Sequence, residues 1–155
     1  MSSKAAEAPS PPAAAEGELE LHLEVVVVPV SDVERAKAFY TERLGFNADV
    51  DRQVSEEMRV IQLTPPGSSC SVTIGTGLGA MEPGSLKGLQ LVVSDIRRAR
   101  DVLAARGVDI SEVQVFDEGS RRPAEDGDEL DFAGFAFFGD PDGNGWAIQQ
   151  MPAGR

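Results

Sequence analysis

The amino-acid sequence predicts an α+β fold in which a strand–helix–strand–strand–strand unit occurs twice. The first indication is a repeat, because an apolar strand is followed by Ser-Asp and a helical pattern at residues 31–32 and again at residues 94–95. The second is the glycine that follows each helix, Gly45 in one unit and Gly107 in the other. The third is a dense turn at residues 140–145, flanked by apolar segments. An internal repeat strongly constrains the fold.

Composition and charge bound the class of protein. The chain has 155 residues, 41% of them hydrophobic and only one of them Cys, which predicts one globular domain without an internal disulfide or a zinc–cysteine site. We assign this domain to residues 19–152 and expect the Ala- and Pro-rich residues 1–18 to form a disordered tail. The net charge of -12, without a large Lys/Arg cluster, predicts no nucleic-acid partner and no membrane partner. Because no apolar run is long enough to span a membrane and no secretory signal is found, we expect a cytoplasmic protein.

The first unit is predicted to cover residues 21–76. Residues 21–30 include four consecutive valines, and stiff β-branched residues suit a buried strand. Ser31 or Asp32 then caps a helix, which Gly45 ends. Helical spacing predicts its buried stripe to be Val33, Ala36, Phe39, Tyr40 and Leu44. Two or three strands follow, at residues 47–54, where the pattern is weak, 58–64 and 71–75.

The second unit is predicted to cover residues 88–151, after a glycine-rich linker at residues 75–88. It begins with an apolar strand at residues 89–93, and the helix that follows carries its buried stripe on Ala99, Val102 and Leu103. The remaining elements are a strand at 113–116, a long polar loop at 117–131 and strands at 135–138 and 146–151.

Three motifs in these units together resemble the vicinal oxygen chelate superfamily, the group of glyoxalases, bleomycin-resistance proteins and extradiol dioxygenases. They are V-S-D-V-E-R-A with F-Y and L-G-F at residues 30–46, L-V-V-S-D-I with R-G-V at residues 91–108, and the D-P-D-G-N turn at residues 140–144. The resemblance implies two βαβββ modules that form a curved, cup-like mixed sheet, with the helices outside and a ligand in the cup. It also implies a homodimer, which is common in this family. Such motifs indicate the fold far better than the reaction.

The resemblance further implies a divalent metal, held in the cup by His, Glu or Gln side chains from four strands. Counted from the motifs, the four positions fall at Val25, Gln62, Gly88 and Ala147. Only Gln62 offers a side-chain donor atom. The single histidine, His22, is expected on the opposite face of its strand, as a solvated residue. We therefore predict no metal and no cofactor in this cup.

Strand alternation predicts instead an apolar cup that carries neutral amides. Two phenylalanines two residues apart are expected to form an aromatic wall, whereas Trp146 is expected to face away from the cup. The predicted ligand-binding residues are Val25, Val27, Gln62, Gln90, Phe135, Phe137 and Gln149. Apolar walls with a few oriented polar groups are typical of ligand pockets. Glutamines that are merely half-exposed sheet residues remain an alternative.

These residues predict a metal-free protein that binds a small, apolar or aromatic organic molecule, for sequestration or resistance. An alternative is an enzyme of the same superfamily, a lyase, isomerase or dioxygenase, that uses a displaced metal or acid/base residues of the polar loop. The loop acids considered for that role are Asp126, Asp128, Glu129 and Asp131. A structural dimer with a filled cup is a third interpretation. No catalytic residue is assigned.

Overall fold

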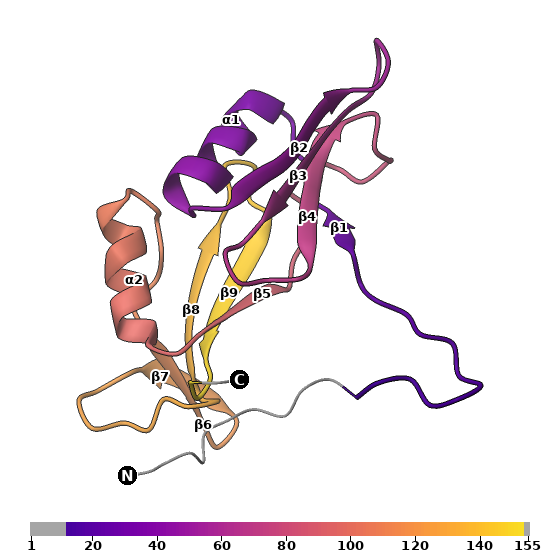
Figure 1. Ribbon diagram of the computed structural model, residues 1–155. Helices are drawn as coiled ribbons and strands as arrows, with labels where there is room; N and C mark the ends of the chain where they lie inside the picture. Colours follow the sequence, from indigo (N-terminus) through magenta and orange to yellow (C-terminus); the bar gives the residue numbers. More distant parts are fainter. Residues whose placement is uncertain (1–11, 154–155) are drawn as a thin grey trace.

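The computed structural model describes residues 12–153, so most of the predicted tail lies outside the described residues. The chain has the predicted α+β architecture (Figure 1). In chain order the elements are β1 (Val25–Val27), α1 (Val33–Ala38), a π-helical turn (Phe39–Arg43), β2 (Asn47–Gln53), β3 (Arg59–Thr64), β4 (Ser71–Thr76), β5 (Leu89–Val93), α2 (Ile96–Ala105), β6 (Gln114–Asp117), β7 (Ser120–Pro123), β8 (Gly134–Gly139) and β9 (Gly145–Gln150).

The strands form two mixed sheets, and their order confirms the internal repeat. The first sheet has the order β1-β4-β3-β2, and the second has the order β5-β9-β8-β6-β7. In each sheet the unit's first strand lies parallel to its last, while the other neighbours are antiparallel. The second sheet differs only by β7, an added edge strand. Both sheets are open, and hydrogen bonding does not merge them into one.

Both helices begin and end as the sequence predicts. Asp32 is the N-cap of α1, because its carboxylate accepts from the backbone N–H of Arg35 at 3.0 Å. Asp95 does the same for α2 through the N–H of Arg98, at 3.1 Å. After α1 the helix widens into the π-helical turn, in which the N–H of Leu44 donates to the carbonyl of Phe39. The two helices then meet at their C-terminal ends (Figure 1).

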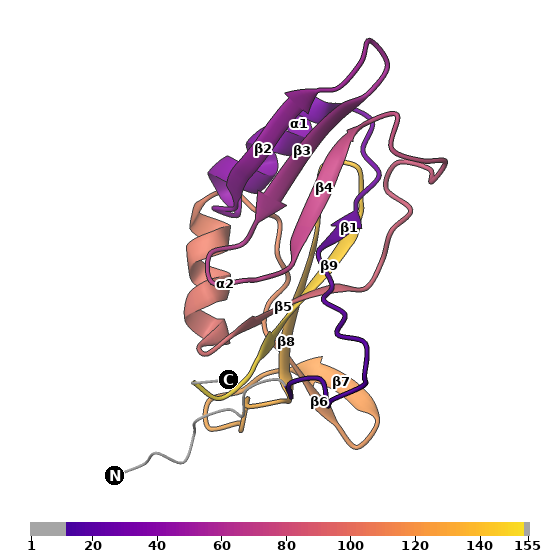
Figure 2. The same cartoon turned by 45° about the vertical axis from the view of Figure 1, so that its right-hand side comes forward.

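The predicted strand at residues 21–30 is much shorter in the structure. Only Val25–Val27 pairs with β4, in parallel register from Val25 opposite Ser71. β4 begins at Ser71, so the ladder starts at Val25, and the N–H of Ser71 donates to the carbonyl of Glu24 at 2.9 Å. Residues 21–23 pair with no strand of the described chain. They run as an extended segment away from the sheet (Figure 2).

The polar loop predicted at residues 117–131 also differs, because it contains strand β7. β6 and β7 form a hairpin in which Asp117 faces Ser120. The two residues between them, Glu118 and Gly119, both have positive φ, 49° and 82°. This is the backbone that a tight hairpin turn requires. The sequence signal is weak because Glu rarely adopts that conformation and β7 itself is polar.

One hydrophobic core lies between the sheets and the helices and includes residues of both modules. In the first sheet, Ile61, Leu63 and Ile74 are completely buried. In the second, Trp146 and Ile148 are buried beneath α1 and α2. Trp146 contacts aromatic residues that follow α1, since its ring lies 5.8 Å from that of Tyr40 and 5.9 Å from that of Phe46. The face of each sheet opposite this core is therefore the face available to a ligand.

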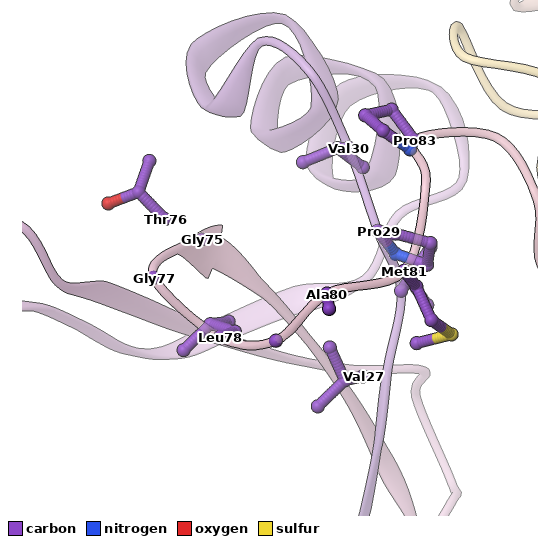
Figure 3. A pocket seen from close by; sticks show the side chains of 12 residues that line it. Val27, Pro29, Val30, Gly75, Thr76, Gly77, Leu78, Ala80, Met81 and Pro83 are labelled. Carbon is purple, nitrogen blue, oxygen red and sulfur yellow. The ribbon is translucent and has the colours of Figure 1, made fainter.

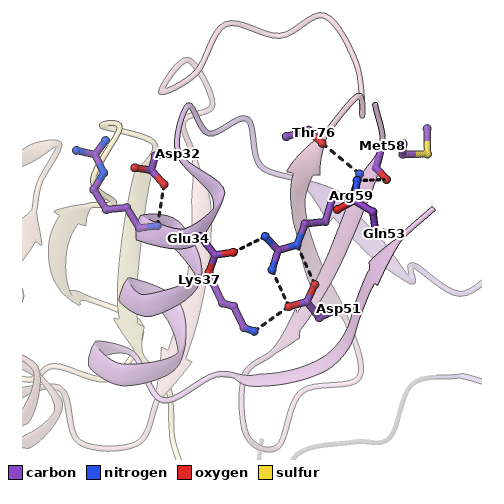
Figure 4. Close-up of polar contacts among 9 residues, drawn as sticks. Asp32, Glu34, Lys37, Asp51, Gln53, Met58, Arg59 and Thr76 are labelled. Atoms are coloured by element: carbon purple, nitrogen blue, oxygen red, sulfur yellow. Dashed lines mark hydrogen bonds and ion pairs between the residues drawn. The ribbon is translucent and has the colours of Figure 1, made fainter. Parts of the chain in front are cut away.

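A cluster of charged residues holds α1 on the first sheet (Figure 4). Arg59 of β3 donates to Asp51 of β2 through two nitrogens, at 3.0 and 2.9 Å, and also binds Glu34 of α1. Lys37 of α1 donates to Asp51 at 2.8 Å. Hydrogen bonds from Arg59 and Lys37 hold the pKa of Asp51 well below its usual range. The cluster thus joins the helix to two strands on the side of the core.

The closing turn joins the two modules through buried polar groups. Asp140 accepts from the hydroxyl of Tyr40 at 2.7 Å and from the backbone N–H of Asn144 at 2.9 Å. Asn144 donates in turn to the carbonyl of Pro29 at 2.8 Å and accepts from the N–H of Leu86 at 3.1 Å. The turn therefore contacts the end of β1, the π-helical turn and the linker at once, and it fixes how the two sheets are placed.

Candidate functional site

The candidate site is the face of the second sheet that points away from the core. Strand register brings four predicted residues together on it. Gln149 of β9 lies opposite Phe135 of β8, and Phe137 lies opposite Ala147. Gln90 of β5 pairs with Ala147. The alternating neighbours Ala136, Phe138, Trp146 and Ile148 are buried in the core. The predicted orientation of Trp146, away from the cup, is confirmed.

The two glutamines on this face are bonded to each other. The side-chain amide of Gln90 donates to the side-chain carbonyl of Gln149 at 2.6 Å. Gln149 donates in turn to the backbone carbonyl of Phe132 at 2.9 Å. Phe132 is exposed and has a φ of 66°, which is strained for an aromatic residue. The amides form a fixed chain across β5, β9 and the segment before β8, and Gln149 is itself buried.

Phenylalanines form a continuous wall beside the glutamines. The rings of Phe135 and Phe137 are almost parallel, with centroids 6.2 Å apart. Phe116 of β6 meets Phe135 edge to face at 4.9 Å, and 46% of its surface is exposed. The guanidinium of Arg121 lies over the ring of Phe137, 4.9 Å from its centroid.

Sequence reasoning missed Phe116 and Arg121. Alternation along β6 was a signal for Phe116, because Gln114 pairs with Phe135 and Phe116 lies two residues further on the same face. Arg121 gave no such signal, since its position depends on the hairpin that brings β7 beside β6.

The remaining predicted residues lie on the first sheet. Val25 and Val27 of β1 pair with Ser71 and Thr73, and Gln62 of β3 also pairs with Thr73. Gln62 lies 3.5 Å from the carboxylate of Glu24, the limit of a weak hydrogen bond. In the described part of the chain, no hydrogen bond joins these residues to Gln90 or Gln149. The structure therefore places the predicted residues on two separate sheet faces.

Two hollows adjoin these faces. The larger, of about 530 Å³, lies between the end of β1 and the glycine-rich linker (Figure 3). Its walls are apolar and include Val27, Leu78 and Met81, the last of which is 47% exposed. The smaller, of about 280 Å³, is lined by Gly88, Phe137 and Ala147 among others. Val27 and Phe137 are the predicted residues that line a hollow, each a different one.

The residues present do not fit the divalent metal that the resemblance implies. Gly88 and Ala147 both line the smaller hollow, but neither has a side-chain donor atom. Among residues 12–153 no group of three or more His, Cys, Asp and Glu side chains is close enough to hold a metal. His22 is largely exposed and binds Glu20 at 2.7 Å. The first-sheet positions add only the amide of Gln62.

Asp128 and Asp131 of the polar loop are engaged in structural contacts. Asp128 accepts from two nitrogens of Arg122, both at 2.9 Å, and from the N–H of Glu125. These bonds, chiefly those from Arg122, hold the pKa of Asp128 well below its usual range. Asp131 accepts from the side chain of Gln150 at 3.0 Å. A general acid needs a pKa near the working pH, which Asp128 does not have.

Two βαβββ modules with matching strand orders define the class of paired-module α+β proteins, and comparison identifies the family. The profile of the Glyoxalase/Bleomycin resistance protein/Dioxygenase superfamily matches residues 22–148. The chain belongs to this superfamily. The predicted family and fold are thereby confirmed.

Solved structures show the same fold. TnmS3, described as an antibiotic binding protein from Streptomyces sp. CB03234, is 30% identical, with a TM-score of 0.67 over 86% of this chain and 98% of that one. A glyoxalase/bleomycin resistance protein from the same organism is 32% identical, with a TM-score of 0.63 over 83% and 100%. A superfamily member from Sphaerobacter thermophilus DSM 20745 is 28% identical, with a TM-score of 0.67 over 85% and 98%. No curated protein matches the chain significantly.

Within residues 12–153, neither helix length nor apolar character is sufficient for a membrane span.

Proposed function

We propose that the chain binds a small organic molecule with an apolar or aromatic body, and that it does so without a metal, as a sequestration or resistance protein. The observation that carries this proposal is the wall formed by the half-buried Phe135 and Phe137 and the exposed Phe116, beside the fixed amides of Gln90 and Gln149. A flat apolar ligand gains most from such a wall, because stacking removes both aromatic surfaces from water. The likeness to an antibiotic binding protein supports the same conclusion.

Metal independence follows from the chemistry of the side chains. The four positions that would hold the metal provide one amide and no imidazole or carboxylate. The single neutral amide of Gln62 cannot bind a divalent ion tightly. The acidic loop does not compensate, since Asp128 is paired with Arg122. The superfamily enzymes' metal chemistry therefore has no support from this donor set.

We further propose that the binding unit is a homodimer. Leu19, Leu21 and Leu23 alternate along the extended segment before β1 and are 71–81% exposed. Alternation places the three side chains on one side of the segment. These exposed leucines form an apolar surface that a second copy would cover. Size-exclusion chromatography with light scattering tests this, and Leu21→Glu with Leu23→Glu should then give a monomer.

Thermal unfolding against a library of aromatic compounds, with elemental analysis of the purified protein, tests the binding function. A bound ligand raises the apparent stability by mass action. We expect some aromatic compounds to stabilise the protein, and we expect Phe135→Ala to abolish this stabilisation. The control Val54→Ala, at an exposed position after β2, should preserve it. One tightly bound metal ion per chain would contradict metal independence. A library without any stabilising compound would contradict the binding function.

A further inference from the structure

We propose that Arg121 and the phenylalanine wall form a subsite for a planar aromatic anion, that is, a flat ring system with a carboxylate or another acidic oxygen. This inference rests on the proposed binding function and names the class of ligand that the same face would accept. Its starting point is the one departure from the internal repeat, strand β7, which has no counterpart in the first sheet.

The position of Arg121 shows what this added strand contributes. β7 borders β6 alone, and Arg121 pairs there with Phe116. Its guanidinium nevertheless lies 4.9 Å from the ring centroid of Phe137, which belongs to β8 on the far side of β6. The side chain therefore crosses β6 above the exposed face. It places a positive charge directly against the aromatic wall.

The wall itself suits a flat ring. Phe135 and Phe137 are inclined by only 6°, and Phe116 stands at 81° to Phe135. A planar ligand can lie along the first pair with the exposed ring of Phe116 at its edge. Arg121 then lies at the end of the wall marked by Phe137.

The charge of Arg121 is not neutralised by the protein. The chain has a net charge of -12, and two other arginines on the sheets have acidic partners, Arg59 with Asp51 and Arg122 with Asp128. By contrast, no ion pair or hydrogen bond engages the guanidinium of Arg121 within the part of the chain that is described. Its planar fork can stack on Phe137 and still donate N–H groups to an acidic oxygen. An anion complements this site, whereas a neutral ligand leaves these donors without a strong acceptor.

Isothermal titration of the full chain with 2-naphthoate and with 2-naphthamide tests the proposal. The two compounds share one ring system and differ in charge. We expect naphthoate to bind on the order of tenfold more tightly at low salt, as a hydrogen bond to a charged group implies. Added salt should reduce this preference. Arg121→Gln should abolish it, while Arg98→Gln, the same charge change on α2 behind the sheet, should leave it intact.

The outcomes separate the subsite from the wider function. If both compounds bind equally, or if Arg121→Gln keeps the preference, the anionic subsite is refuted while the binding function stands. If neither compound binds at millimolar concentration, the anionic subsite is refuted, and the library screen by thermal unfolding decides the binding function separately. Arg121→Lys provides a second variant, and we expect it to retain part of the preference because it keeps the charge but loses the planar fork. Thermal unfolding confirms that each variant is folded.

Discussion

The hydroxyl of Tyr40 donates a 2.7 Å hydrogen bond to the carboxylate of Asp140, and the two residues belong to different modules of the repeat. The indole N–H of Trp146 donates to the same hydroxyl at 3.0 Å. Tyr40 is completely buried, and only 6% of Asp140 is exposed. A polar contact this deeply buried is costly to break, because its groups cannot be solvated in place.

Removing this hydroxyl should destabilise the whole protein. In Tyr40→Phe, Asp140 and Trp146 each lose a buried partner, so we expect the free energy of unfolding to fall by about 1–3 kcal/mol. Urea unfolding followed by circular dichroism measures it. Thr41→Val is the matched control. The Thr41 hydroxyl donates only to the helical backbone carbonyl of Lys37, so its loss should have little effect on the free energy of unfolding. Equal losses in the two variants would contradict the role assigned to the buried contact.

Ionisation of Tyr40 should make the stability of the protein fall at alkaline pH. Burial, and then the negative charge of Asp140, raise the pKa of Tyr40 above its ordinary value. Because the pKa of Tyr40 is higher in the folded state, the neutral hydroxyl contributes to the free energy of unfolding. This contribution is complete below the unfolded pKa of about 10 and is lost as the pH rises above it toward the folded pKa. The chain has a single tyrosine, so Tyr40→Phe isolates the effect. We expect unfolding free energies between pH 8 and 11 to decline more steeply in the wild type. Parallel declines would show that Tyr40 ionises equally in both states.

Acid should weaken the attachment of α1 to the first sheet. The folded pKa of Asp51 is depressed by Arg59 and Lys37, so its contribution is present above the unfolded pKa of about 4 and is lost as the pH falls through the folded value. Asp51→Asn should therefore flatten the stability curve below pH 4. The comparison is Glu56→Gln, which removes an exposed carboxylate in the turn between β2 and β3. An unchanged curve in Asp51→Asn would argue against the cluster.

Two glycines with similar backbones separate steric contact from backbone strain. Gly84 in the linker has a φ of 82°, and an added Cβ would lie 2.1 Å from the carbonyl oxygen of Asp142. Gly127 has a φ of 87°, but its Cβ would meet nothing within 4 Å. We expect Gly127→Ala to cost only the left-handed strain of about 1–2 kcal/mol. Gly84→Ala should cost clearly more, as thermal unfolding would show. Similar losses of stability in the two variants would mean that the linker shifts to relieve the contact between the added Cβ and Asp142.

Much of the fold could be predicted from local pattern. Asp32 and Asp95 cap their helices because a carboxylate satisfies the free N–H groups, and this chemistry is visible in the sequence. Alternation also placed Gln149 and Phe135 correctly on one face. It could not show that Gln62 lies apart from them, because alternation fixes the face of a strand and not the position of one sheet relative to another.

The candidate site was harder to predict because its contacts cross several strands. Arg121 reaches Phe137 only through a hairpin whose turn begins with Glu118, a residue that gives no strong turn signal. The bond between Gln90 and Gln149 likewise depends on β5 lying beside β9, although 59 residues separate the two amides in sequence. Such contacts follow from the assembled sheet.

The two modules share one core, and this limits where the sequence can vary. Tyr40 of one copy fills space beside Trp146 of the other, so neither copy contains a complete interior of its own. The chain should unfold in a single transition, and neither half should fold when expressed alone. Variation is thereby confined to the outward sheet faces and to additions at a sheet edge. Strand β7 lies where such an addition is tolerated, because it extends the edge of one sheet outside the core that both modules share.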